Sequence, residues 1–240
     1  SGSWSNAPIG GVVLLDQNGS NLNGLFDVYG STILDSDATA PLSAPTVWKA
    51  RLEALALYGG NQLEYNSPTS YREMYFGLYW RTNPQYQGRI VGNKMFFLSS
   101  DTVNGVWLFH NTRLSNGAGT YMFSPNSAGV NNAHILGTSD PGAPFFPNVG
   151  NGTLRVGVWY KLEGYIKAST SLSSRDGILK WWINDVLVGS YLNINYCGPA
   201  GQTLNKWVQT QTWDGSGDMG SSNTVAWEHY IDHLRIVGKN

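Results

Sequence analysis

The stretch that decides the fold spans residues 156–189 and has the sequence VGVWYKLEGYIKASTSLSSRDGILKWWINDVLVG. Over residues 160–168, apolar or small side chains alternate with charged and aromatic ones, and the alternation recurs over residues 178–184. Successive side chains of a β-strand point to opposite faces, so each segment predicts a strand with one face in a core. Residues 174–177 (SRDG) have the composition of a turn between them.

The other face of these two strands is charged and aromatic. If the strands pair, that face carries Trp159, Lys161, Glu163, Tyr165, Lys167, Lys180 and Trp182. Exposed contiguous aromatic surface usually marks a binding site, and lysines neutralise anions. We interpret the face as a binding surface, with a plain solvated face as the alternative.

Composition fits one all-β domain over residues 1–240. The chain is 41% hydrophobic and 13% aromatic, with 29 glycines for turns. Its net charge of −1 provides no global field toward nucleic acid or acidic lipid, so we expect neither partner. No run of apolar residues is long enough to span a membrane. The lone Cys197 excludes an internal disulfide and a cysteine metal site.

Further strands are predicted along the chain. In residues 71–81, the core-type residues Met74, Phe76, Leu78 and Trp80 alternate with a polar-aromatic set that includes Tyr75, Tyr79 and Arg81. Strands are also predicted near residues 11–15, 25–29, 93–100, 106–111, 121–123, 134–136, 204–213 and 225–237. Residues 48–58 are ambiguous, and their Ala, Leu, Glu and Arg content favours a helix.

Many short strands with glycine-rich turns, and at most one helix, predict a sandwich or barrel. A curved two-sheet jelly roll fits best, because several strands carry polar-aromatic faces that could line one concave groove. Within this sandwich we expect Trp80, Leu162, Trp181 and Ile183 in the core.

Several segments together resemble a known family. They are YREMYFGLYW (71–80), VGNKMFFL (91–98), VWYKLEGYIKA (158–168), DGILKWWINDVLVG (176–189) and WEHYIDHLRIVG (227–238). This combination resembles the concanavalin-like jelly-roll polysaccharide lyases, nearest to the heparin-lyase and glucuronan-lyase types. The resemblance covers most of residues 70–110 and 155–238. It implies a concanavalin A-like fold, cleavage of a uronic-acid polysaccharide by β-elimination, and a secreted, extracellular protein, which we expect to be a monomer.

Two short segments are similar to motifs of alginate lyases. Tyr165–Ile166–Lys167–Ala168 resembles their Tyr-Phe-Lys-Ala, and Leu108–Phe109–His110 matches their Gln-Ile-His without the Gln. These departures argue against an alginate lyase proper and leave the catalytic assignment open.

Elimination from a uronide requires neutralisation of the C6 carboxylate, a base for the C5 proton and an acid for the leaving O4. The resemblance implies a tyrosine for acid or base. Tyr165 is the first candidate, because Lys167 and Lys180 on the same face would stabilise its phenolate. Catalytic candidates are thus Tyr165, His110 as a second base, and Lys167. Candidate substrate-binding residues are Tyr75, Tyr79, Arg81, Trp159, Glu163, Lys180 and Trp182.

This chemistry requires no cofactor. Asp232 in the closing strand resembles the acid that binds a structural Ca²⁺ on the convex side of many jelly rolls, and it is a candidate calcium ligand.

Two alternatives to a lyase stay open. The same fold and surface suit a carbohydrate-binding module or lectin without catalysis. A jelly-roll glycoside hydrolase is less well supported, because no Glu-x-Asp-x-x-Glu run supplies paired carboxylates on one strand.

Overall fold

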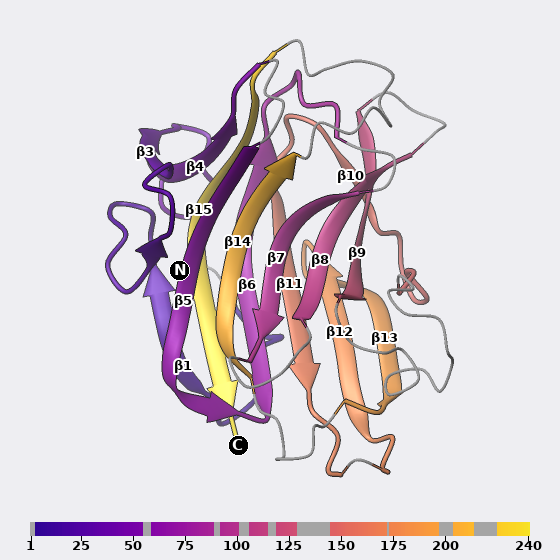
Figure 1. Cartoon of the computed structure of the whole chain (residues 1–240). Coiled ribbons are helices and arrows are strands. Elements are labelled where there is room, and N and C mark those ends of the chain that lie inside the picture. The colour runs from indigo at the N-terminus through magenta and orange to yellow at the C-terminus, as the bar shows by residue number, and fades with distance from the viewer. Residues whose placement is uncertain are drawn as a thin grey trace.

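A computed structural model describes residues 3–54, 59–88, 92–100, 106–114, 119–128, 145–171, 173–196, 204–213 and 225–240. These residues form two antiparallel sheets, here called sheet A and sheet B, stacked as a sandwich. In Figure 1 the strands β5, β14, β7 and β8 of sheet B lie in front of β15, β6, β11 and β12 of sheet A. No helix of the described residues is long and apolar enough to cross a membrane.

Sheet A has eight strands and contains the first and the last strand of the described chain. Its order is β13 (Val186–Ile194), β12 (Gly177–Ile183), β11 (Tyr160–Lys167), β6 (Glu73–Thr82), β15 (Trp227–Lys239), β4 (Thr46–Leu52) and β3 (Ile33–Ser36), and β1 (Val12–Gln17) also pairs with β15.

Sheet B has seven strands. Its order is β10 (Thr153–Arg155), β9 (Thr120–Ala128), β8 (Val106–Arg113), β7 (Asn93–Ser99), β14 (Leu204–Trp213), β5 (Gly59–Tyr71) and β2 (Phe26–Asp27).

The strand pair predicted from residues 156–189 is confirmed as β11 and β12. Their register places Glu163 opposite Trp182 and Tyr165 opposite Lys180. Directly opposite residues share a face of a sheet, so the charged and aromatic side chains gather on one side as expected. On the other side of β11, Leu162 is fully buried against the second sheet.

The space between the sheets is filled mainly by aromatic side chains. The largest fully buried residues include Trp48, Trp80, Trp181, Trp207, Trp227, Phe76, Phe96, Phe109 and Phe123. All four predicted core residues are buried. Close packing leaves no space for some added methyl groups: a Cβ on Gly189 would lie 2.0 Å from the indole of Trp181. Burial of each large side chain contributes about 1.5–3 kcal/mol, so this core is the main source of stability.

The helix predicted at residues 48–58 is wrong where the structure describes it. Residues 46–52 form β4, which pairs with β3 and β15. Trp48, Ala50 and Leu52 are buried, whereas Lys49 and Arg51 point outward, so the period of two overrides the helix propensity of the individual residues. Residues 55–58 and the expected strand at 134–136 lie outside the described residues.

Candidate functional site

The N-terminal segment, residues 3–9, lies across the outer face of sheet A. The Trp4 ring covers Gly77, where an added Cβ would lie 2.6 Å from the indole. The same ring meets Tyr79 edge-on at 6.0 Å between centroids and stacks on His233 at 5.7 Å. The Lys161 ammonium lies 4.9 Å from the centroid of the Trp4 ring, in cation–π geometry. Trp4 therefore fixes the segment to the middle of the sheet.

Beneath this segment, a buried polar group replaces the open surface that the sequence predicts. Tyr75 donates a hydrogen bond of 2.5 Å to Glu163 Oε1, and Asn6 donates one of 3.0 Å to Glu163 Oε2. Lys161 lies 3.6 Å from Glu163 Oε2 and also contacts Ser3 O. Burial raises the pKa of Glu163 and of Tyr75. Both residues were expected to bind substrate, but here they are covered and hold the N-terminal segment in place.

A pocket of about 450 Å³ opens beside this segment, above β6, β11 and β12. Residues 5–9 form one wall, and the sheet contributes Glu73, Tyr165, Lys167, Lys180 and Trp182, with Lys239 from the end of β15. We call this the basic pocket. It brings together four of the predicted site residues, namely Tyr165, Lys167, Lys180 and Trp182.

The ionisation of Tyr165 differs from the expectation. Its hydroxyl donates a hydrogen bond of 2.7 Å to Glu73 Oε2. Burial, and then the contact with the Glu73 carboxylate, raise the pKa of Tyr165, whereas the lysines were expected to lower it. The phenol is therefore protonated at neutral pH, which makes it a hydrogen-bond donor and a poor base.

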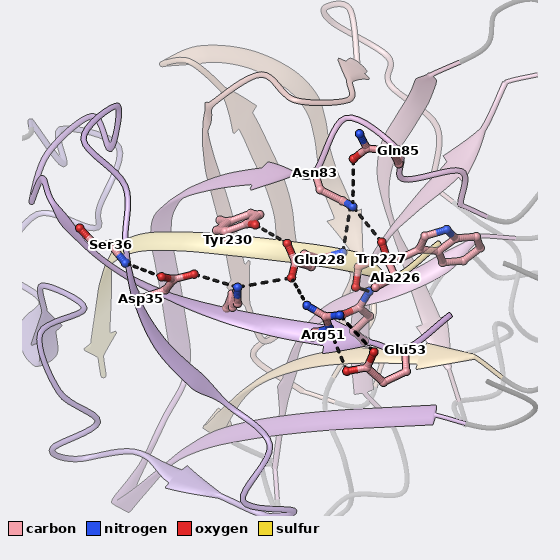
Figure 2. A network of polar contacts seen from close by, with 12 residues as sticks. Asp35, Ser36, Arg51, Glu53, Asn83, Gln85, Ala226, Trp227, Glu228 and Tyr230 are labelled. Atoms are coloured by element: carbon pink, nitrogen blue, oxygen red, sulfur yellow. Dashed lines mark hydrogen bonds and ion pairs between the residues drawn. The ribbon is translucent and has the colours of Figure 1, made fainter. Parts of the chain in front are cut away.

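The lysines of the basic pocket form no ion pair with a carboxylate of the described residues, although Lys167 and Lys239 lie opposite Glu73 on the neighbouring strands. Within the described ranges, no ion pair involves Lys167, Lys180 or Lys239. Elsewhere on the outer face of sheet A, cations are paired: Figure 2 shows Arg51 between Glu228 and Glu53, at 3.1 and 2.8 Å. The basic pocket thus has three ammonium groups and a single carboxylate, which leaves it with a positive charge.

Three other predicted substrate-binding residues lie away from the basic pocket. Arg81 is eight positions from Glu73 along β6, about 26 Å at the usual rise per residue. Its guanidinium forms an ion pair of 2.6 Å with Asp37 and lies between the rings of Trp159 and Tyr230, 5.1 and 4.8 Å from their centroids. Trp159 and Arg81 therefore form a separate cluster.

The third of these residues, Tyr79, contacts the Trp4 ring edge-on and is only partly exposed beneath the N-terminal segment.

His110 and Tyr165 belong to different sheets. His110 is in β8 of sheet B, in register with Lys94 of β7 and Ser124 of β9. The neighbours of Tyr165 in β11, Gly164 and Ile166, face the core, so Tyr165 points away from sheet B. Because packed sheets are about 10 Å apart, the two residues cannot act on one substrate atom, and the predicted catalytic group is not assembled.

Sheet B has a polar cluster of its own, which the sequence reading did not identify. On β5, Gln62 contacts Glu64 Oε1, and Asn66 donates a hydrogen bond of 3.3 Å to Glu64 Oε2. Lys206 of β14 lies 3.5 Å from the same carboxylate. The exposed aromatic ring of Phe26 is in register with Glu64. We call these four polar residues the Glu64 cluster. The alternation of polar Gln62, Glu64 and Asn66 with Leu63 and Tyr65 is the signal that would have found it.

The surroundings of Asp232 do not fit a calcium site. Its carboxylate is fully buried and accepts hydrogen bonds from the backbone N–H groups of Leu42 at 2.6 Å and Ser43 at 3.0 Å. Calcium takes six to eight oxygen ligands, whereas these neighbours are donors. Among the described residues, no group of three or more His, Cys, Asp or Glu side chains could hold a metal ion. Asp232 instead fixes the loop before β4.

Comparisons with known proteins identify the fold. No protein-family model and no curated protein matches the sequence. Among solved structures, the alginate lyase Aly36B superposes with a TM-score of 0.65 at 19% identity, over 92% of this chain and 95% of that one. A variant of the same enzyme, in complex with alginate trisaccharide, gives a TM-score of 0.67 at 17% identity, over 99% of this chain and 96% of that one.

Two further structures show how widely the fold is used. The endo-β-1,4-glucuronan lyase of the fungus Trichoderma reesei gives a TM-score of 0.62 at 12% identity, over 95% and 96% of the two chains. A family 16 endo-glucanase from Bacteroides ovatus gives 0.62 at 9% identity, over 93% and 100%. The predicted concanavalin-like jelly roll, shared with polysaccharide lyases, is confirmed. Because a hydrolase shares it, the fold alone does not define the reaction.

Proposed function

We propose that the protein is a polysaccharide lyase that cleaves a uronic-acid polysaccharide on the outer face of sheet B. The observation that carries the proposal is the Glu64 cluster, which gathers two amides, a lysine and a carboxylate in the sheet that also contains His110. Its fold is shared along almost its whole length with an alginate lyase and a glucuronan lyase. We also propose that the protein is secreted, since such substrates lie outside cells.

The faces of the two sheets differ in how they could accept a polymer. The outer face of sheet A is crossed by residues 3–9, which bury Glu163 and Gly77. A polysaccharide chain cannot lie across that part of the sheet. In Figure 1 the strands β5, β14 and β7 face the viewer, and none of the other described elements crosses them. We therefore place the proposed cleavage on sheet B rather than on the part of sheet A that residues 3–9 cover.

The Glu64 cluster suits the binding of a polyuronide. Lys206 and the amides of Gln62 and Asn66 can donate to the carboxylate of one uronate unit of the polymer, while β8, which contains His110, is three strands away from β5 in sheet B, about 14 Å at the usual strand spacing. Glu64 is a positioning residue in this proposal, because it holds all three donors.

His110 is the proposed base. A neutral imidazole can accept a proton. In this proposal it takes the proton from C5 of the unit that it contacts, the C4–O4 bond breaks, a C4–C5 double bond forms and the leaving O4 takes a proton from solvent water. Tyr165 and Lys167 have no step in this scheme, because they lie on sheet A.

The test is to incubate the protein with alginate, glucuronan, a heparin-type glycan and a neutral glucan. A lyase produces an unsaturated uronate that absorbs ultraviolet light, together with new reducing ends. A hydrolase produces reducing ends without the chromophore, and a binding module produces neither. We expect the chromophore with at least one polyuronide and not with the neutral glucan.

Single substitutions then show which sheet contains the active site. His110→Ala should reduce kcat/KM by about 10²–10⁴-fold, the usual effect of losing a proton-transfer group. Lys206→Ala should reduce it by about 10- to 100-fold through weaker substrate binding, the usual effect of losing one hydrogen bond to a charged group. Tyr165→Phe should remain within about threefold of the parent, far below that effect. The opposite pattern, with Tyr165→Phe inactive and His110→Ala active, would move the chemistry to sheet A.

A further inference from the structure

We propose that the basic pocket on sheet A is a second, non-catalytic binding site for a short carboxylated sugar, such as a uronic acid or a di-uronide. It is on the face of the sandwich opposite the proposed cleaving face. The inference rests on the pocket's own geometry and charge, and it does not depend on the reaction proposed for sheet B.

Size favours a small ligand. The volume of about 450 Å³ is within the range of about 300–1,000 Å³ that is typical of small-molecule sites. One wall is the N-terminal segment, with Pro8 and Ile9. This wall stands over β6, β11 and β12, so a long polymer cannot continue through the pocket in that direction. A ligand of one or two sugar units fits, and a polysaccharide would enter only by an end.

The positive charge of the basic pocket favours an anionic ligand. Lys167, Lys180 and Lys239 line the pocket and have no ion pair within the part of the chain that the structure describes. Lys167 and Lys180 come from adjacent strands, and Lys180 is directly opposite Tyr165. Three ammonium groups facing one carboxylate leave about two positive charges for a ligand to balance. A carboxylate bound there makes charge-assisted hydrogen bonds, which are about twice as strong as neutral ones.

The remaining lining groups favour a sugar over a simple anion. The Tyr165–Glu73 pair, at 2.7 Å, has a carboxylate with acceptor positions for sugar hydroxyls. Inorganic phosphate would meet repulsion at Glu73, whereas a uronate has hydroxyls to donate there. Trp182 and Ile178 supply apolar surface beside the lysines, against which the carbon face of a sugar ring can pack. Cations, an acceptor and an aromatic surface together match a uronate.

The test is calorimetric titration of the full chain with sodium glucuronate and an alginate disaccharide, with glucose and inorganic phosphate as comparison probes. We expect uronate to bind more tightly than glucose or phosphate. Lys167→Ala and Lys180→Ala should each weaken uronate binding by about 10- to 100-fold, the usual effect of losing one hydrogen bond to a charged group. Arg155→Ala removes an exposed cation on β10, the edge strand of sheet B and therefore remote from the basic pocket, and should leave the uronate affinity unchanged.

Controls separate this site from the cleaving face. Lys206→Ala should keep the tight uronate binding that Lys180→Ala weakens, and Lys180→Ala should leave turnover of polysaccharide unchanged. Three results would overturn the proposal: equal binding of phosphate, equal binding of glucose, or uronate binding that is lost in Lys206→Ala and kept in Lys180→Ala. Calorimetry measures binding without requiring turnover. A protein that binds uronate in the pocket but cleaves no polyuronide would therefore refute the proposed lyase activity and leave the binding-site proposal intact.

Discussion

Tyr165 and His229 are two titratable side chains that sheet A holds in their neutral forms. Tyr165 is partly buried, and its hydroxyl faces the Glu73 carboxylate. His229 is fully buried in the core, with ring centroids 5.3 Å from Trp80 and 5.2 Å from Tyr86. Burial disfavours the charged form in both cases, so it raises the pKa of the phenol and lowers that of the imidazole to about 3. At this scale, environment rather than residue type decides which groups can exchange protons.

His229 should make the fold sensitive to acid. The unfolded imidazole takes up a proton below its ordinary pKa of about 6.5, whereas the folded one resists protonation down to about 3. The unfolded state therefore binds more protons between these values, and stability falls as the pH falls through this window. At pH 4.5 the loss from this group should be about 2–3 kcal/mol, from 1.4 kcal/mol per pH unit. This loss of stability is measured by urea unfolding of the parent and of His229→Gln at pH 7 and at pH 4.5.

The His229→Gln substitution removes the titratable imidazole but keeps a polar side chain. We expect His229→Gln to be less stable than the parent at pH 7, because the site is tightly packed, and to lose less stability between the two pH values. Equal losses for the two proteins would mean that acid acts through other groups, such as the paired carboxylates of the surface.

At the scale of elements, the N-terminal segment functions as an additional layer on sheet A. It adds no strand, but Trp4 packs against Gly77, Tyr79 and His233, and Asn6 and Ser3 complete the hydrogen bonding of Glu163 and Lys161. Without this layer, a lysine and a carboxylate would lose part of their hydrogen bonding, and the basic pocket would lose a wall.

Trp4→Ala should therefore affect both stability and the basic pocket. Loss of a partly buried indole should reduce the free energy of unfolding by about 1–3 kcal/mol, below the 3–5 kcal/mol of a fully buried tryptophan. Uronate binding should weaken, because residues 5–9 are no longer fixed. Trp4→Phe keeps a ring over Gly77 and should lie between the two. If Trp4→Ala unfolds at the parent's denaturant concentration, the segment does not contribute to the fold.

The sequence predicts elements well where alternation is strict. The strands β6, β11 and β12 have apolar residues at every second position, and the structure confirms their faces. At β4, helix-favouring side chains mask the period of two. In residues 59–71 the alternation is limited to residues 62–66 and the flanking residues are mostly polar or glycine, so β5 was not predicted there and the Glu64 cluster was missed.

Which strands pair within one sheet is a property of the whole molecule, and the alternation of residues along a single strand does not encode it. The alternation around Tyr165 and around His110 predicts two strands with polar faces, but not whether the strands share a sheet. That depends on the chain path: β8 pairs with β7 and β9, whereas β11 pairs with β6 and β12. Outward faces of different sheets point in opposite directions, so residues that looked like one site belong to two surfaces. The fold class was predictable from sequence, but the composition of the site was not.

Two surfaces separated by a packed core should act independently, and this can be measured in the double variant Lys180→Ala/Lys206→Ala. Lys180 belongs to the basic pocket and Lys206 to the Glu64 cluster, in different sheets. Effects of substitutions more than about 7–10 Å apart, without shared partners, usually add within about 0.3–0.5 kcal/mol. The double variant should therefore have the turnover of Lys206→Ala and the uronate affinity of Lys180→Ala. A turnover more than about threefold below that of Lys206→Ala would exceed this additivity limit and show that ligand in the basic pocket influences cleavage on the opposite face.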